Sequence, residues 1–185
     1  LLTGTKSIMK AEITGKRIAQ SIIFIICLTS IDQITKWAAA KNLAGEPFVL
    51  IPGVLELRYL ENTGAAFGIL QNSQWFFILL TAVFLFIAGL FYFKIPAEKK
   101  YRALRLVVLF ITSGALGNFI DRIMIGHVRD FIYYSLIDFP IFNVADIYIT
   151  LSAAAAFILV IFIYKGSDFD FLKSPDNKEK ETKDE

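Results

Sequence analysis

The sequence has few of the residues that bind metals or form disulfides. Its 185 residues include one cysteine, Cys27, and one histidine, His127. An intrachain disulfide is therefore excluded, and a zinc site, which needs three or four protein ligands, is not expected. The sequence has no glycine-rich phosphate loop, and its basic residues gather beside apolar segments. We therefore expect no metal, no cofactor and no nucleic-acid partner.

Charged residues are also scarce, and some long stretches contain none. Only 19% of the residues are charged and 56% are hydrophobic, which is more apolar than an ordinary soluble domain. Two uncharged stretches run from Trp75 to Phe93 and from Ile147 to Tyr164. Each is close to the roughly 20 residues that a helix needs to cross the hydrocarbon core. This composition predicts an integral membrane protein.

We expect four membrane spans, at about 18–40, 75–93, 103–120 and 147–164. Small residues in the third and fourth segments favour close packing of neighbouring helices. In the first outer loop, Phe48 to Leu60 partly alternates apolar and polar residues and contains the turn signal Pro52-Gly53. The predicted fold is an all-α membrane protein with four transmembrane helices and a small extracytoplasmic β-sheet in this loop.

Basic residues predict the orientation. They precede the first span, fill the connection between the second and third spans, and follow the fourth. The positive-inside rule then places both termini in the cytoplasm and loops 41–74 and 121–146 on the opposite side. Residues 18–165 would form the membrane domain.

The remaining segments lie at the two ends of the chain. Residues 1–17 would be an N-terminal cytoplasmic segment, in which Met9 is a candidate native start and residues 1–8 are a candidate leader. Residues 166–185 would be a charged cytoplasmic tail, and we expect it to be disordered because it has too few apolar residues to pack.

Two aspartates stand at the edge of neighbouring spans. A carboxylate near the hydrocarbon costs roughly 2–4 kcal/mol unless it is solvated or paired, so Asp130 and Asp146 are candidate functional groups. Two carboxylates in one low-dielectric site retain a proton between them. One can then activate water while the other polarises a carbonyl. Asn118 and Asn143 are placed to orient them. The alternative from spacing alone is that Asp146 is a helix N-cap and Asp130 an ordinary loop residue.

Two further groups of polar residues accompany the aspartates. Asp32 and Lys36 are separated by one helical turn and can form an ion pair, either as a pair at the membrane edge or in support of the site. Arg122 follows Asp121 directly and is expected to form a salt bridge with it at the end of the helix, with contact to a lipid phosphate as the alternative.

Five short motifs occur in order between residues 18 and 165. Together they resemble the lipoprotein signal peptidase family, the type II bacterial signal peptidases. The motifs are Asp32-Gln33-Ile34-Thr35-Lys36, Asn62-Thr63-Gly64-Ala65-Ala66-Phe67, Gly117-Asn118-Phe119-Ile120-Asp121-Arg122, Val128-Arg129-Asp130-Phe131 and Phe142-Asn143-Val144-Ala145-Asp146.

The resemblance implies an aspartic endopeptidase of the bacterial cytoplasmic (inner) membrane. Such an enzyme removes signal peptides from prolipoproteins by cutting before a diacylglyceryl-modified cysteine. It further implies inhibition by globomycin. We also expect contact with membrane lipid and action as a monomer, and the positive-inside rule places the active site at the extracytoplasmic face. Asp130 and Asp146 match the family's catalytic pair. Residues expected to bind substrate or support the site are Asp32, Lys36, Asn62, Gly64, Asn118, Arg122, Asn143 and Ala145.

Two other classes were weighed against this interpretation. A four-span transporter or binding protein with proton-relay carboxylates would carry them near mid-span, whereas Asp130 and Asp146 lie at one edge. A presenilin-type protease would carry Gly-x-Gly-Asp within a span, and the sequence lacks that motif. Arg129, directly before Asp130, replaces the hydrophobic residue that is commoner in the resembled family and adds a charge beside the pair.

Overall fold

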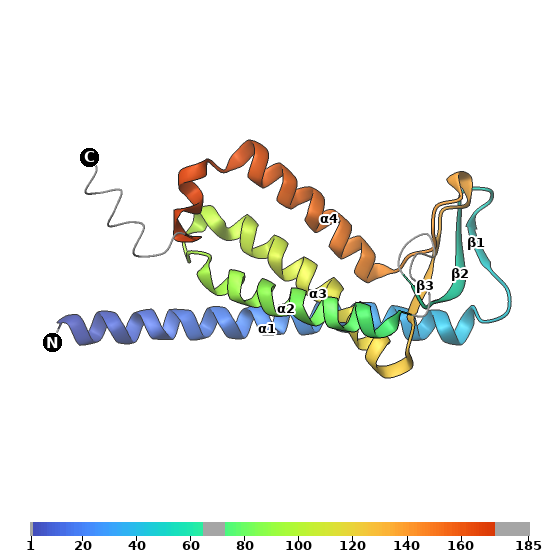
Figure 1. Cartoon of the computed structure of the whole chain (residues 1–185), viewed down its shortest axis with the longest axis horizontal. Coiled ribbons are helices and arrows are strands. Elements are labelled where there is room, and N and C mark those ends of the chain that lie inside the picture. The colour runs from blue at the N-terminus through green and yellow to red at the C-terminus, as the bar shows by residue number, and fades with distance from the viewer. Residues whose placement is uncertain (1, 65–72, 173–185) are drawn as a thin grey trace.

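The computed structural model describes residues 2–64 and 73–172, with side chains described from residue 15 onward. Four long helices lie side by side, and a small sheet lies across one end of them (Figure 1). Residues 65–67 of the second motif and residues 173–185 of the expected tail lie outside the described residues. The elements are α1 (Leu2–Asn42), β1 (Phe48–Ile51), β2 (Leu55–Asn62), α2 (Gln74–Lys94), α3 (Arg102–Ile125), β3 (Val128–Tyr133) and α4 (Val144–Ile158).

Within the described residues, four helices are long and apolar enough to cross a membrane, as predicted. Their candidate spans are residues 15–42, 74–94, 99–125 and 144–163. Large apolar side chains on α2, such as Trp75 and Phe86, are exposed on the outside of the bundle, as expected where lipid replaces water. The chain is therefore a multi-pass membrane protein.

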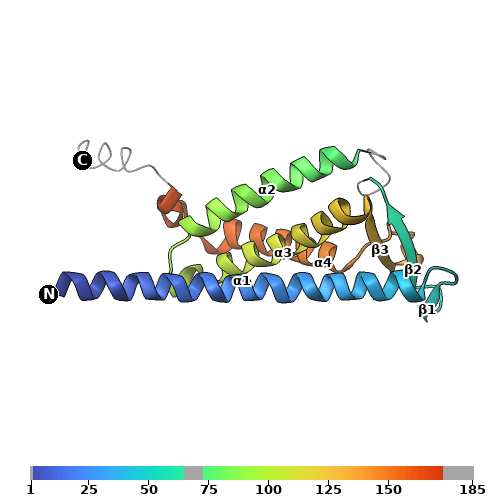
Figure 2. The same ribbon diagram turned by 90° about the horizontal axis from the view of Figure 1, so that it is seen from below.

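The boundaries of two helices differ from the predicted ones. Helix α1 is continuous from Leu2, well before the expected start near Ile18, and its first turns extend past the other helices (Figure 2). Helix α3 continues to Ile125 and ends at Gly126, which adopts φ 78°. Because glycine reaches this left-handed conformation without strain, it suits the helix end. Asp121 therefore lies on α3 and not in the outer loop expected from residue 121.

The sheet is antiparallel, with strand order β1-β2-β3. Strands β1 and β2 were predicted from the first outer loop, but β3 comes from the second. The prediction placed the sheet within the first loop alone, and this was incomplete. The pairing joins the two outer loops, so the sheet brings Asn62 on β2 close to Asp130 on β3.

Helix α3 lies between the other helices and packs against all three. At Gly114, an added Cβ would come within 2.5 Å of the Ala145 carbonyl oxygen. At Gly117, it would come within 2.3 Å of Asp32 Oδ2. These two glycines therefore permit the close approach of α1, α3 and α4 beneath the sheet, as small residues do in membrane helix packing.

An aromatic cluster closes the end of the bundle away from the sheet. Residues Gly166–Leu172 form a 3₁₀ helix, which corrects the expectation that the whole segment after residue 165 is disordered. Phe169 and Phe171 of this segment pack against the buried rings of Tyr101 and Tyr164. Burial of these rings holds residues 166–172 against the bundle.

Candidate active site

Asp130 is a buried carboxylate on β3 and not the loop residue of the alternative interpretation. It is only 2% exposed. Asn62 Nδ2 donates to its Oδ2 at 2.8 Å, and Asn143 Nδ2 donates to its Oδ1 at 2.6 Å. Each carboxylate oxygen thus has an amide donor, which offsets part of the cost of burying the group.

Asp146 lies in the first turn of α4. Asn143 is the N-cap: its Oδ1 accepts from the Asp146 backbone N–H at 3.1 Å, while its own N–H donates to Asp146 Oδ2 at 3.0 Å. This reciprocal capping box fixes the Asp146 side chain, and the helix N-terminus favours its negative charge. Asp146 is therefore the third residue of the helix, and the alternative interpretation that it is the N-cap was wrong.

Two asparagines connect the carboxylates. Asn118 Nδ2 donates to Asp146 Oδ1 at 2.8 Å, and Asn143 Nδ2 donates to Asn118 Oδ1 at 3.2 Å as well as to Asp130. Lys36 Nζ also donates to Asn118 Oδ1, at 2.7 Å. Because that oxygen accepts from two donors, the Asn118 amide is held with its nitrogen toward Asp146. The predicted orienting role of both asparagines agrees with these contacts.

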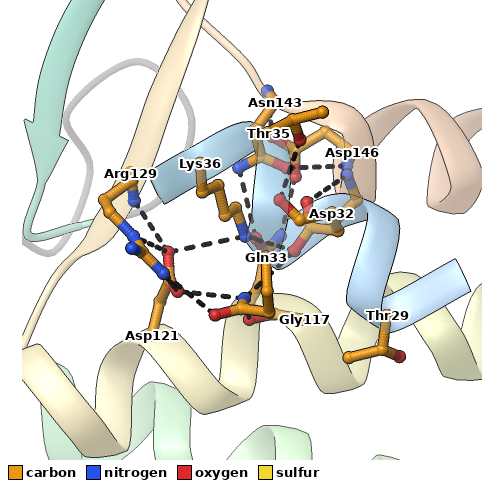
Figure 3. A network of polar contacts seen from close by, with 12 residues as sticks. Thr29, Asp32, Gln33, Thr35, Lys36, Gly117, Asp121, Arg129, Asn143 and Asp146 are labelled. Atoms are coloured by element: carbon orange, nitrogen blue, oxygen red, sulfur yellow. Dashed lines mark hydrogen bonds and ion pairs between the residues drawn. The ribbon is translucent and has the colours of Figure 1, made fainter. Parts of the chain in front are cut away.

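A buried ion pair lies directly behind the asparagines (Figure 3). Lys36 Nζ is 2.9 Å from Asp32 Oδ2 and 3.5 Å from Asp121 Oδ2, and all three side chains are fully buried. The predicted pair of Asp32 and Lys36 is therefore confirmed, but it is not an exposed pair at the membrane edge. Asp32 Oδ1 also accepts from the backbone N–H of Ala145 at 2.9 Å. The pair thus connects α1 to the start of α4.

A pocket of about 1050 Å³ opens between the sheet and helices α3 and α4. Asp130 and Asp146 both line it, together with Asn62, Gly64 and Asn118. Apolar side chains form much of its remaining wall; they include Leu60, Ile141, Phe142, Ile147 and Leu151. The pocket can therefore receive a peptide with apolar side chains, whose backbone polar groups would face the two carboxylates.

Arg122 also lines the pocket but does not make the predicted salt bridge with Asp121. Its guanidinium lies 5.0 Å from the centre of the Phe77 ring and donates weakly to the Gly64 carbonyl oxygen at 3.4 Å. Asp121 pairs instead with Lys36 and Arg129. The prediction failed because α3 continues through both residues, and consecutive helical residues point in different directions.

The environment of Asp130 favours its protonated form. Burial and the neighbouring Asp146 carboxylate raise the pKa of Asp130 to about 7, although its two asparagine donors oppose the shift. A carboxyl group that holds its proton near neutrality can act as an acid, while a neighbouring carboxylate acts as a base. The geometry therefore supports acid–base chemistry on a bound substrate.

Comparison with known proteins agrees with this chemistry. A model of the family described as Signal peptidase (SPase) II matches residues 23–163. The chain belongs to the signal peptidase II family. It is 41% identical over 151 residues to a lipoprotein signal peptidase of Symbiobacterium thermophilum, covering 80% of this chain and 98% of that protein. It is 40% identical over 149 residues to a lipoprotein signal peptidase of Streptococcus pyogenes, covering 80% and 95%.

Solved structures give the same result for the fold. A bacterial membrane enzyme determined by the in meso method at 2.3 Å superposes with a TM-score of 0.69 and 33% identity, covering 78% of this chain and 88% of that one. A second bacterial membrane enzyme, determined by the same method at 1.9 Å, superposes with a TM-score of 0.68 and 33% identity, covering 80% of this chain and 96% of that one. The signal peptidase II family consists of aspartic endopeptidases, so this chain is an enzyme of that class.

Six of the ten predicted site residues of this signal peptidase II family member line the pocket. Of the other four, Lys36 and Asn143 donate to Asn118, and Asp32 accepts from the backbone of Ala145. Sequence reasoning gave no role to Arg129 beyond an added charge and left Gln33 out of the predicted site, yet both contact Asp121. In β3, Arg129 and Asp130 point to opposite sides because side chains alternate along a strand. Recognising 128–133 as a strand would have shown that the arginine faces away from the carboxylate pair.

Proposed function

We propose that Asp130 and Asp146 are the catalytic dyad of a lipoprotein signal peptidase. The observation that carries the proposal is their joint position in one pocket, connected through Asn118 and Asn143. One carboxylate takes a proton from water, which attacks the scissile carbonyl carbon. The protonated carboxyl group donates to the carbonyl oxygen and so stabilises the developing charge. Collapse of the intermediate breaks the C–N bond, and the leaving amine takes the proton that the first carboxylate removed from water.

The substrate is a prolipoprotein whose cysteine already carries diacylglyceryl. The apolar walls of the pocket and the exposed apolar sides of α2 and α4 support contact with acyl chains and with the signal helix. Asn62, Gly64 and Arg122 line the pocket and offer polar groups to the peptide. Globomycin, as a peptide inhibitor of the resembled family, is proposed to occupy the same pocket.

The pocket faces the extracytoplasmic side, and both termini are cytoplasmic. The sheet lies at one end of the helices, while the basic connection between α2 and α3 lies at the other (Figure 1). The pocket lies beside the sheet, because strand residues such as Leu60 and Asp130 line it. That connection contains Lys94, Lys99 and Lys100, which the positive-inside rule assigns to the cytoplasm. One chain supplies both aspartates and both asparagines, which supports action as a monomer, with residues 18–165 forming the peptidase domain.

The function is tested by comparing two forms of one prolipoprotein, with and without diacylglyceryl on the cysteine, in detergent. We expect cleavage before the modified cysteine and a loss of at least about tenfold in kcat/KM without the lipid, because its burial supplies binding energy. A chelator is expected to leave the rate unchanged. Equal cleavage of both forms would contradict the proposed presentation of substrate at the membrane interface.

A further inference from the structure

The strand that carries Asp130 is attached along both edges. On one edge β3 pairs with β2, with Leu60 opposite Asp130. On the other edge the backbone N–H of Arg129 donates to Asp121 Oδ2 at 3.0 Å, and that of Phe131 donates to the Phe142 carbonyl oxygen at 3.0 Å. Asp130 therefore lies between two points at which the backbone is fixed to the rest of the protein.

The Arg129 side chain strengthens the first of these attachments (Figure 3). Its guanidinium donates to both Asp121 oxygens, from Nη2 at 2.6 Å and from Nε at 3.2 Å. Nη2 also donates to Gln33 Oε1 at 2.9 Å, and Gln33 Nε2 donates back to Asp121 Oδ1 at 3.1 Å. We call Gln33, Asp121 and Arg129 the Asp121 clamp; it joins α1, α3 and β3.

The contacts of the clamp suit a rigid connection. A two-pronged arginine–carboxylate pair restricts direction as well as distance. The Asp121 side chain is fully buried and that of Arg129 is 16% exposed, so water screens the pair only weakly. Gln33 further fixes α1 to α3 by donating to the Gly117 carbonyl oxygen at 3.0 Å. The clamp therefore connects β3 to the part of the helices that holds Lys36 and Asn118.

We propose that the Asp121 clamp is a positioning device for catalysis, which holds β3 so that Asp130 meets Asp146 across the pocket. The inference rests on the dyad proposed above. Arg129, Asp121 and Gln33 are not among the described residues that line the pocket, so they act through Asp130. Small displacements of a reacting group, on the order of 1 Å, are enough to lower a rate about 100-fold.

The test measures kcat and KM for Arg129→Gln and Arg129→Lys on the lipid-modified prolipoprotein. We expect Arg129→Gln to lower kcat by at least about tenfold while KM changes less than about twofold, because the pocket wall is unchanged. Arg129→Lys keeps the positive charge but cannot bind Asp121 through two parallel N–H donors, so its kcat is expected to lie between those of Arg129→Gln and wild type. Lys100→Gln, which removes an ion pair with Asp168 at the far end, is the matched control and should match wild type.

A second arm separates positioning from general damage. Asp121→Asn and the double variant Asp121→Asn/Arg129→Gln are measured with thermal unfolding of each protein. If the two residues act as one clamp, the double variant loses no more kcat than the worse single variant. The proposal would be overturned if the losses in kcat of the two single variants added in the double variant, or if KM rose while kcat stayed at the wild-type value. If Arg129→Gln does not fold, wild-type kcat in Arg129→Lys would also overturn it.

Asp130→Asn in the same series distinguishes the two proposals. If Asp130→Asn is inactive while Arg129→Gln folds and is fully active, the proposed dyad is supported and the positioning role of the Asp121 clamp is contradicted. A fully active Asp130→Asn would instead remove the dyad, whatever the result for Arg129. Loss of activity in both, with KM retained in Arg129→Gln, is the result that supports the positioning role.

Discussion

Replacing Asp130 or Asp146 by asparagine is expected to lower kcat by about 10²- to 10⁴-fold, the range typical of a lost acid or base. Asparagine keeps the size of the side chain but can neither take a proton from water nor donate a carboxyl proton. Asn62 and Asn143 would still contact residue 130, and Asn118 and Asn143 would still contact residue 146. The loss should therefore appear in kcat far more than in KM, measured on purified protein in detergent.

The double variant Asp130→Asn/Asp146→Asn decides whether the two residues act as a unit. Groups that act together are strongly non-additive, so the double variant should lose about as much activity as either single variant. Asp168→Asn, the same chemical change at the far end of the bundle, is the control and should keep wild-type turnover. Near-normal turnover by either single variant would remove that residue from the dyad.

Replacing Lys36 by methionine is expected to destabilise the protein by about 3–5 kcal/mol, as removal of one partner from a buried ion pair does. Methionine fills similar space but leaves Asp32 without a cation, in a site where all three side chains are fully buried. The change also removes the Lys36 donor from Asn118, so turnover should fall with stability. Unfolding in mixed micelles provides the measurement.

Two matched variants check the cause of that loss. Asp32→Asn/Lys36→Met removes both charges and is expected to recover part of the lost stability, because no unpaired carboxylate then remains at Asp32. Lys100→Met removes a lysine from an exposed pair and should change stability little. Equal stability of Lys36→Met and wild type would show that the buried pair contributes no net stability.

The spans could be predicted because hydrophobicity is a local property of the chain. Two of the four were marked by uncharged stretches: Trp75 to Phe93 lies within an observed span, and Ile147 to Tyr164 ends one residue past the observed span 144–163. The end of α3 was harder to place. Asp121 and Arg122 were taken as the start of a loop because charges usually end a span, but Asp121 is paired inside the protein and the helix continues.

The third strand was missed for a related reason. Val128 to Tyr133 contains residues that favour strands, but the adjacent charges of Arg129 and Asp130 conceal the alternation. Each of these side chains contacts a residue far away in sequence, Gln33 for Arg129 and Asn62 for Asp130. Contacts of this kind arise only when distant segments come together. For the same reason the Asp121 clamp could not be inferred from spacing.

A carboxyl proton held by the pair of Asp130 and Asp146 is central to the proposed mechanism, and the pH dependence of kcat/KM for the wild-type enzyme tests it most directly. This ratio reports the free enzyme, in which burial and the Asp146 carboxylate raise the pKa of Asp130 to about 7. Below that value the pair holds its proton, and above it the proton is lost. We therefore expect kcat/KM to fall as the pH rises through about 7, where Asp130 loses its proton. A rate that stays level from acid through neutrality into the alkaline range would contradict the shared proton.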